Sequence, residues 1–451
     1  MSRLLAAVRW RVRRVLRFWR ARLGQSEQRS GLGRPRIHER ESRTNHYDAV
    51  DLLRAIAVRQ ANGAVIEEVR DRVRGASAPA VRIAFLVTSP ARWNATQLAR
   101  SLAEHGRFEV SVHVFPPIFS NYTPEQREAE HQDSLEFFRG LGHPVVNHLD
   151  AQGSVIPVED IECDVAFLEM PWGMKDFPRR LLGKALSAYM HYGFMMMANH
   201  EMHYNIASFH SYLWRYYTQT EGHRRMHLRH DATADARIRV VGYPKLDAYL
   251  EHTGLQVADG ERTIIYAPHH SLGKDNLGMS TFPWSRTGIA DLRAEHPSLR
   301  WMLKPHPGMR SSVVRNKVMS AEEYDEYLAS WARDPSAEVY ESGEYFDLFR
   351  RSAALITCSG SFLAEYLPTG RPIIHLDSGR SVGFNDVGQV LARGFYRVRS
   401  NEELKQVFRD VVVDGNDPLE HVRRELIAEL LPAGGTASER IVEDLEATFL
   451  R

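Results

Sequence analysis

Three short apolar runs in the second half of the chain are each followed by residues suited to acid–base or phosphate chemistry. The runs cover 263–267, 300–304 and 353–357. The residues at or just after their ends are His269, His270, Ser271, Lys304, His306, Arg310, Ser359, Gly360 and Ser361. Because the carboxyl ends of parallel strands meet at one edge of a sheet, we expect these residues to converge on one ligand.

Ser359–Ser361 opens a predicted helix and favours a phosphate. Its backbone N–H groups, two hydroxyls and the positive helix end all suit a phosphate oxygen. The alternative is a plain helix N-cap, since Ser and Gly are common there. With Lys304, His306 and Arg310 expected on a neighbouring strand end, the pattern predicts a diphosphate site.

Two histidines are the candidates for proton transfer. Imidazole titrates near neutral pH, so His270 and His306 are predicted to act as catalytic acid or base groups. His269 is expected to have a supporting, structural place. Glu365, one turn into the helix after Ser361, is predicted either to bind a ribose or to lie on a solvated face. Asp347 is expected to hold a loop or helix start near the site.

Other residue patterns exclude several classes of site. The two cysteines lie far apart, which argues against a disulfide framework or a structural zinc site. The sequence has no GxGxxG after the first strand, no GxxxxGK[ST] and no GxSxG. No metal and no cofactor beyond an activated donor are therefore expected. A second loose group of histidines lacks metal-ligand spacing and is interpreted as structural or acceptor-facing: His200, His203, His223, His227 and His230.

The rest of the chain alternates strand-like and helix-like segments, which is typical of parallel α/β domains. The 451 residues are too many for one ordinary core. We predict an arm and linker at 1–36, an acceptor domain at 37–250 and a donor domain at 251–451. Within the acceptor domain, 178–190 is expected to be a helix and 191–198 a strand or buried segment.

The N-terminal arm carries the basic charge of the chain. Residues 1–40 contain twelve Arg and two Glu, a net charge of 12 − 2 = +10, so the remainder is 1 − 10 = −9. A nucleic-acid-binding role for the whole chain gains no support from this distribution. Within 3–23, apolar residues recur at helical spacing opposite the arginines, which predicts a helix lying in an anionic membrane surface. Docking on the protein itself or a partner, and an organellar presequence, are the alternatives.

No stretch of the sequence is apolar enough for a transmembrane helix, and the N-terminus lacks the apolar centre of a secretory signal. The expected location is the cytoplasmic face of the cell membrane, with peripheral attachment. The sequence leaves self-association open.

The order of several motifs resembles the CDP-glycerol glycerophosphotransferase family, the teichoic-acid primases and polymerases. The similarity covers about residues 80–400. Its motifs are Ala188-Tyr-Met-His-Tyr-Gly-Phe, Ile264-Ile-Tyr-Ala-Pro-His-His, Leu303-Lys-Pro-His-Pro, Asp347-Leu-Phe-Arg-Arg, Ser359-Gly-Ser-Phe-Leu-Ala-Glu-Tyr and Gly370-Arg-Pro-Ile-Ile. The family usually has an Asp and a Ser-Ser pair where this chain has Cys358 and Ser359-Gly360.

The resemblance implies a GT-B fold, two Rossmann-like domains with a cleft between them, and a membrane-linked glycan or teichoic-acid-like acceptor. An acceptor hydroxyl would attack the β-phosphorus of a CDP-activated alditol and release CMP. His270 would match the base-like position and His306 the phosphate-contacting one. Two alternatives stay open: a GT-B glycosyltransferase using a CMP- or UDP-sugar for a surface polysaccharide, and an inactive GT-B scaffold.

Overall fold

The computed structural model describes residues 49–75, 79–117, 123–251, 262–273, 277–340, 345–431 and 434–451. Residues 51–451 form one compact unit that contains two domains. The predicted arm at 3–23 lies outside the described residues. None of the helices in the described ranges has the length and apolar character needed to cross a bilayer.

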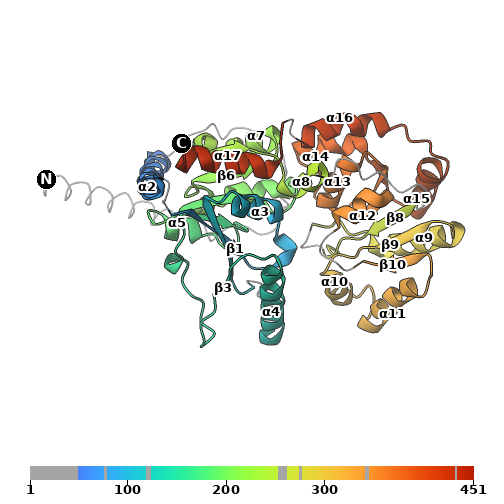
Figure 1. Cartoon of the computed structure of the whole chain (residues 1–451). Coiled ribbons are helices and arrows are strands. Elements are labelled where there is room, and N and C mark those ends of the chain that lie inside the picture. Colours follow the sequence, from blue (N-terminus) through green and yellow to red (C-terminus); the bar gives the residue numbers. More distant parts are fainter. Residues whose placement is uncertain are drawn as a thin grey trace, which may run out of the picture. The chain divides into compact units, whose positions relative to one another are not determined.

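The first domain is built on a seven-stranded parallel sheet (Figure 1). Its strands are largely buried apolar runs, as expected when helices cover both faces of a parallel sheet. In spatial order they are β3 (Val145–Asn147), β2 (Phe108–Val114), β1 (Val81–Val87), β4 (Val165–Leu168), β5 (Leu186–Met190), β6 (Arg215–Thr218) and β7 (Ile238–Val240).

The second domain repeats the design with six parallel strands. In spatial order they are β10 (Ala337–Val339), β9 (Arg300–Leu303), β8 (Thr263–Ala267), β11 (Ser352–Thr357), β12 (Ile373–Leu376) and β13 (Tyr396–Val398). This confirms the α/β class and the two Rossmann-like domains of a GT-B-like fold. β8 lies between β9 and β11, so the three loops singled out in the sequence leave neighbouring strands.

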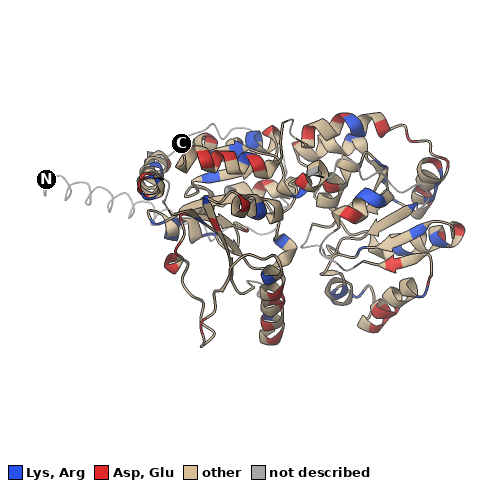
Figure 2. Cartoon of the chain, in the orientation of Figure 1, with Lys and Arg blue, Asp and Glu red and all other residues tan. Residues whose placement is uncertain are grey.

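Helices cover both faces of each sheet. The first domain contains α2 (Ala49–Val73), α3 (Thr96–Glu104), α4 (Pro124–Gly140), α5 (Phe177–Leu181), α6 (Ala207–His210), α7 (Glu221–His230) and α8 (Asp247–Glu251). The second domain contains α9 (Phe282–Glu295), α10 (Met309–Arg315), α11 (Ala321–Ala332), α12 (Phe346–Arg351), α13 (Gly360–Tyr366), α14 (Asp386–Leu391), α15 (Asn401–Phe408) and α16 (Glu420–Leu430). Basic and acidic side chains are interspersed over both (Figure 2).

The last helix, α17 (Ala437–Phe449), returns to the first domain and lies alongside α3 (Figure 1). Its residues Ile441, Leu445 and Phe449 are buried in the core formed on the first sheet. Asp444 accepts a hydrogen bond of 2.9 Å from the Tyr217 hydroxyl and pairs with Arg215 at 2.8 Å. The prediction placed 251–451 in the donor domain, whereas the last helix of this range packs as part of the first domain.

The structure corrects the predicted helix at 178–190. α5 ends at Leu181, and Gly183 then adopts a left-handed φ of 79°, which suits glycine and ends the helix. Leu186–Met190 forms a fully buried strand between β4 and β6. The following segment, 191–198, is largely buried but adds no strand to the sheet, which agrees with the second of its two predicted forms.

Candidate functional site

Three histidines meet at the carboxyl edge of the second sheet. His269 and His270 follow β8, and His306 follows the adjacent strand β9. The ring centroids of His270 and His306 are 3.9 Å apart, and those of His269 lie 4.4 Å from His270 and 5.0 Å from His306. The structure thus brings these two predicted loops together.

Hydrogen bonds set which ring nitrogen of two of these histidines carries the proton. The Gly308 N–H donates to Nδ1 of His306 at 3.0 Å. Ser271 Oγ lies 2.8 Å from Nδ1 of His269, and the Ser271 N–H donates to the same nitrogen at 3.3 Å. A neutral imidazole whose Nδ1 accepts must carry its proton on Nε2. His269 and His306 therefore present N–H donors.

This proton placement bears on whether the cluster holds a cation or an anion. The candidate ligand atoms of the three histidines lie within 4.8 Å of one another, close enough to surround a metal ion. A metal requires a lone pair on the ligating nitrogen, whereas an anionic oxygen requires an N–H. The donors of His269 and His306 favour an anion.

Burial keeps these rings neutral. Desolvation lowers the pKa of His270 to about 4 and that of His306 to about 3, and for His306 the charges of His270 and Lys304 add to the effect. Burial also lowers the pKa of His269 well below its ordinary value. At pH 7 the histidines therefore supply hydrogen-bond donors without net charge, and the positive charge comes from lysine.

Lys304 is that positive charge. It follows the last residue of β9 and is buried, with 8% of its surface exposed. Its ammonium lies 5.1 Å from the ring centroid of Tyr340 and 5.2 Å from that of Tyr345, so two aromatic faces stabilise the cation.

The third predicted loop follows β11 and is built by Thr357 and Cys358. The Thr357 hydroxyl donates to the Ala267 carbonyl at 2.6 Å and accepts from the Ser359 N–H at 2.9 Å. The Cys358 thiol accepts from the His269 N–H at 3.2 Å, which ties this loop to the histidine cluster. Burial raises the pKa of that thiol.

A narrow pocket lies beside Gly360, lined among others by Met197, His375 and Asp377. A Cβ at position 360 would lie 2.9 Å from the Met197 sulfur, so a larger residue there would require the methionine side chain to shift. Ser359 is buried and Ser361 is partly exposed. The loop predicted to bind phosphate is therefore covered in part by a methionine from the segment after β5, and its phosphate-binding role stays a prediction.

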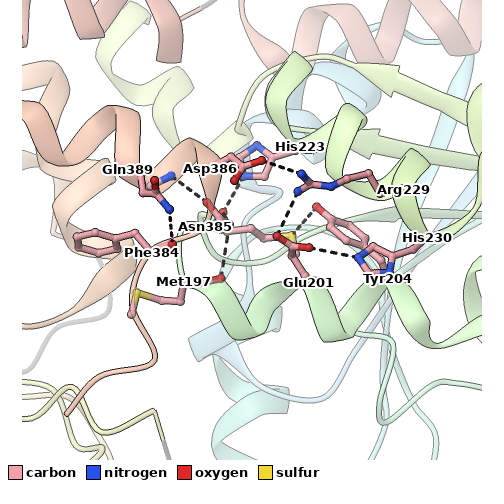
Figure 3. A network of polar contacts seen from close by, with 12 residues as sticks. Met197, Glu201, Tyr204, His223, Arg229, His230, Phe384, Asn385, Asp386 and Gln389 are labelled. Carbon is pink, nitrogen blue, oxygen red and sulfur yellow. Dashed lines mark hydrogen bonds and ion pairs between the residues drawn. The ribbon is translucent and has the colours of Figure 1, made fainter. Parts of the chain in front are cut away.

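That segment, Phe194–Ala198, reaches the loop 383–385 of the second domain. The Ala198 N–H donates to the Gly383 carbonyl, and the Asn385 N–H donates to the Met196 carbonyl, both at 2.9 Å. Figure 3 shows the network that holds this crossing. Its ion pairs are Arg229–Asp386 at 2.8 Å and Arg229–Glu201 at 3.2 Å, and Nε2 of His230 lies 3.3 Å from the Glu201 carboxylate.

Glu365 is buried rather than on a solvated helix face, with 1% of its surface exposed. Its carboxylate accepts hydrogen bonds from the hydroxyls of Tyr345 at 2.5 Å and Tyr243 at 3.0 Å. Tyr243 belongs to the loop after β7, so this carboxylate connects the two domains. These contacts correct the solvated alternative, while the ribose-binding role stays a prediction.

Two predicted residues are engaged elsewhere. Arg310, on α10, is exposed and forms a bidentate pair with Asp325 of α11, with both N–O distances at 2.8 Å. Asp347 is exposed and pairs with Arg350 one turn later on α12. In the part of the chain that the structure describes, neither contacts the histidine cluster, so Arg310 is not placed as a donor ligand and Asp347 serves its own helix.

A polar cluster at the carboxyl edge of the first sheet was not predicted from the sequence. Glu169, after β4, is buried and accepts from the Thr88 hydroxyl at 2.6 Å and the Thr88 N–H at 3.1 Å. Arg92 lies 3.1 Å from the same carboxylate. The sequence did contain a signal for this cluster, because Glu169 directly follows a buried strand, as Lys304 does.

No family model matches this chain, and no curated protein does. Its fold is similar to that of solved UDP-N-acetylglucosamine 2-epimerases. The enzyme from Neisseria meningitidis, bound to UDP-GlcNAc, is 14% identical with a TM-score of 0.52, over 81% of this chain and 99% of that one. The enzyme from Methanocaldococcus jannaschii, with UDP-GlcNAc and UDP, is 15% identical with a TM-score of 0.51, over 81% and 99%. MnaA from S. aureus, with UDP, is 13% identical with a TM-score of 0.54, over 81% and 96%.

At these identities the likeness establishes the GT-B-like fold. It overturns the assignment to the CDP-glycerol glycerophosphotransferases, because neither a family model nor a curated protein supports that family and the structural neighbours are UDP-GlcNAc 2-epimerases. The expectations of a CDP-activated alditol, CMP release and a teichoic-acid acceptor were wrong with it. The Lys-Pro-His-Pro and Ser-Gly-Ser motifs mark strand ends of the fold, where parallel sheets place ligand loops, and do not specify a donor.

Proposed function

We propose that this protein is an enzyme that binds a UDP-sugar at the carboxyl edge of its second sheet. The observation that carries the proposal is the cluster of His269, His270, His306 and Lys304. Two N–H donors and one buried ammonium suit the charged oxygens of a diphosphate. The nucleotide sugars and UDP bound by the structural neighbours support uridine as the first nucleoside to test.

The first reaction to test is isomerisation of the sugar, the activity named for the neighbours of this fold. The second candidate is glycosyl transfer from the UDP-sugar, the alternative open from the sequence. It is favoured by the polar cluster at the first sheet, where Glu169 and Arg92 lie at the edge that would meet an acceptor. Both reactions use the same nucleotide site.

The experiment is to titrate the protein with UDP-GlcNAc, UDP and CMP by calorimetry, and to follow UDP-GlcNAc by proton NMR in D₂O. Tight binding of UDP compounds with deuterium entering the sugar ring would support an isomerase, because inversion of a C–H centre through proton exchange takes hydrogen from solvent. Release of UDP only when an acceptor glycan is added would favour transfer. Binding without turnover would favour the scaffold alternative, and no binding of UDP compounds would overturn the proposal.

We further propose that the arm holds the protein on an anionic membrane surface. Within the described residues, α2 leaves Leu52, Leu53 and Ile56 exposed at 47%, 65% and 55%, and these apolar side chains offer a further surface for lipid contact. Deleting residues 1–36 is expected to abolish co-sedimentation with phosphatidylglycerol vesicles, since each Arg near the surface adds about 1 kcal/mol.

Leu53→Ser with Ile56→Ser is expected to weaken the same co-sedimentation several-fold, because a smaller apolar area enters the lipid. Val155→Ser is the matched control, being exposed at 53% on a different surface segment. Equal sedimentation of the full-length and shortened proteins would remove the membrane assignment.

A further inference from the structure

A further cluster of polar and aromatic side chains, separate from that of Glu169, lies at the carboxyl edge of the first sheet. None of its residues belongs to the cluster of histidines and lysine at the second sheet. The further cluster comprises Trp172 after β4, His191 and Tyr192 after β5, and His203 in the short helix Ala198–Asn205. The indole of Trp172 lies 4.8 Å from the His203 ring and 5.8 Å from that of Tyr192, measured between centroids. His191 is buried, whereas Trp172, Tyr192 and His203 are partly exposed.

A backbone carbonyl determines which ring nitrogen of His191 carries the proton. Nδ1 of His191 lies 2.8 Å from the Gly193 carbonyl oxygen, which can only accept, so Nδ1 carries the proton. The Gly193 N–H also points at this nitrogen, but over a longer distance of 3.2 Å, so the carbonyl contact at 2.8 Å is the stronger of the two. An unprotonated Nδ1 would place two lone pairs 2.8 Å apart, which the shorter contact excludes.

The proton position on His191 in turn sets that on His203, which is its hydrogen-bond partner. With its proton on Nδ1, His191 offers a lone pair at Nε2, and Nδ1 of His203 lies 3.1 Å away. His203 must donate there, which leaves its Nε2 with a lone pair. In the described residues no hydrogen bond reaches that nitrogen. This state is the reverse of that of His306, whose Nε2 carries a proton.

The surroundings keep His203 in that state. Burial lowers its pKa to about 4, so the ring is neutral at physiological pH. The titratable rings packed against it are His191 and His200, and Nε2 of His210 lies 2.9 Å from its carbonyl oxygen. Burial also lowers the pKa of His200 to about 3. The cluster therefore offers a neutral acceptor nitrogen beside an aromatic face.

We propose that His203 Nε2 and the indole face of Trp172 form a subsite for the sugar ring of the ligand, with Nε2 accepting a hydrogen bond from a sugar hydroxyl. An aromatic face suits the apolar C–H face of a sugar, and a lone-pair nitrogen selects a hydroxyl over a phosphate oxygen. The choice of a sugar rests on the proposed function, whereas the acceptor state of His203 rests on the geometry alone.

The first test reads the tautomers directly. Long-range proton–nitrogen NMR of the full chain with ¹⁵N-histidine is expected to show His203 protonated at Nδ1 and His306 protonated at Nε2. Assignment uses His203→Gln and His306→Asn. Protonation of His203 at Nε2 would overturn the inference whether or not any nucleotide binds.

The second test separates sugar from nucleotide. His203→Ala is expected to lower the affinity for UDP-GlcNAc about tenfold and leave that for UDP unchanged, because one hydrogen bond to the sugar is lost. His203→Gln, which keeps an acceptor oxygen, should recover part of the loss. His143→Gln is the control, since His143 precedes β3 at the opposite edge of the sheet.

The outcomes distinguish the two proposals. UDP binding that shifts the His306 signals, together with a UDP-GlcNAc affinity that His203→Ala leaves unchanged, would overturn the sugar subsite and keep the nucleotide site. An equal loss for UDP and UDP-GlcNAc in His203→Ala would also overturn it, because a structural role would affect both. Failure of UDP to bind the wild-type protein would instead overturn the proposed function.

Discussion

Replacing His306 with asparagine is expected to weaken UDP-GlcNAc binding by about one to two orders of magnitude and leave the fold intact. The lost group is the Nε2–H donor, and a hydrogen bond to a charged partner contributes about 1.5–3 kcal/mol. Asparagine can place its Oδ1 near the position of Nδ1, so the Gly308 N–H keeps an acceptor. Calorimetry at about pH 7.5 measures the affinity, and circular dichroism checks the fold.

His306→Ala should lose at least as much affinity, because it removes the local acceptor as well. The matched control is His296→Asn, since His296 follows α9 at the amino end of β9, on the far edge of the same sheet. Wild-type affinity in both His306 variants would contradict the assignment of the nucleotide site to this histidine.

The pH dependence of binding checks the proton placement. The pKa values of His270 and His306, about 4 and about 3, lie far below neutral pH, so both rings stay neutral above about pH 5. UDP-GlcNAc affinity is therefore expected to be flat between about pH 5.5 and 8. Binding by cationic histidines of ordinary pKa would instead weaken as the pH rises through about 6.5.

Acidification is expected to destabilise the protein by several kcal/mol, well before its carboxylates titrate. Burial lowers the pKa of His223 to about 4 and that of His227 to about 3, against an ordinary value near 6.5. Below about pH 6.5 these histidines therefore bind protons in the unfolded chain, whereas in the folded chain they stay neutral until a much lower pH. Stability is fully present above about pH 6.5 and falls with decreasing pH, by about 1.4 kcal/mol per pH unit for each such histidine.

His227→Phe tests one contributor. Both ring nitrogens of His227 are buried without a hydrogen-bond partner in the described structure, and its neighbours are aromatic, with Tyr204 and Tyr216 centroids at 4.7 Å and 5.1 Å. Phenylalanine cannot be protonated and fits that setting. Urea unfolding at about pH 5.0 and 7.5 should show a smaller pH effect in this variant than in the wild type.

The exposed His421→Phe is the control for that comparison and should leave the pH effect unchanged. A wild-type difference below about 1 kcal/mol between the two pH values would show that the buried histidines are not the acid-sensitive element, since several of them contribute in the same direction.

The sequence was most informative where local pattern and burial coincide. The runs at 81–87 and 263–267 are continuous apolar stretches bounded by polar or turn residues, and they are strands β1 and β8 with those limits. The strand ends that carry His269, His270, Lys304 and His306 follow from the same logic. Local periodicity was misleading at Leu186–Met190, because a short buried strand and a helix segment share the same composition.

The amino-acid sequence by itself therefore determined the parallel α/β design, the order of its loops and the strand ends that carry polar residues, because hydrophobic periodicity and turn residues act over a few positions. Only the tertiary structure decided that Arg310 pairs with Asp325, that Glu365 is buried between two tyrosines and that α17 belongs to the first domain. It also decided which nitrogens of His203 and His306 hold a proton. The ion pair of Arg310, the burial of Glu365 and the position of α17 depend on neighbours farther along the chain and on desolvation, which no local pattern contains.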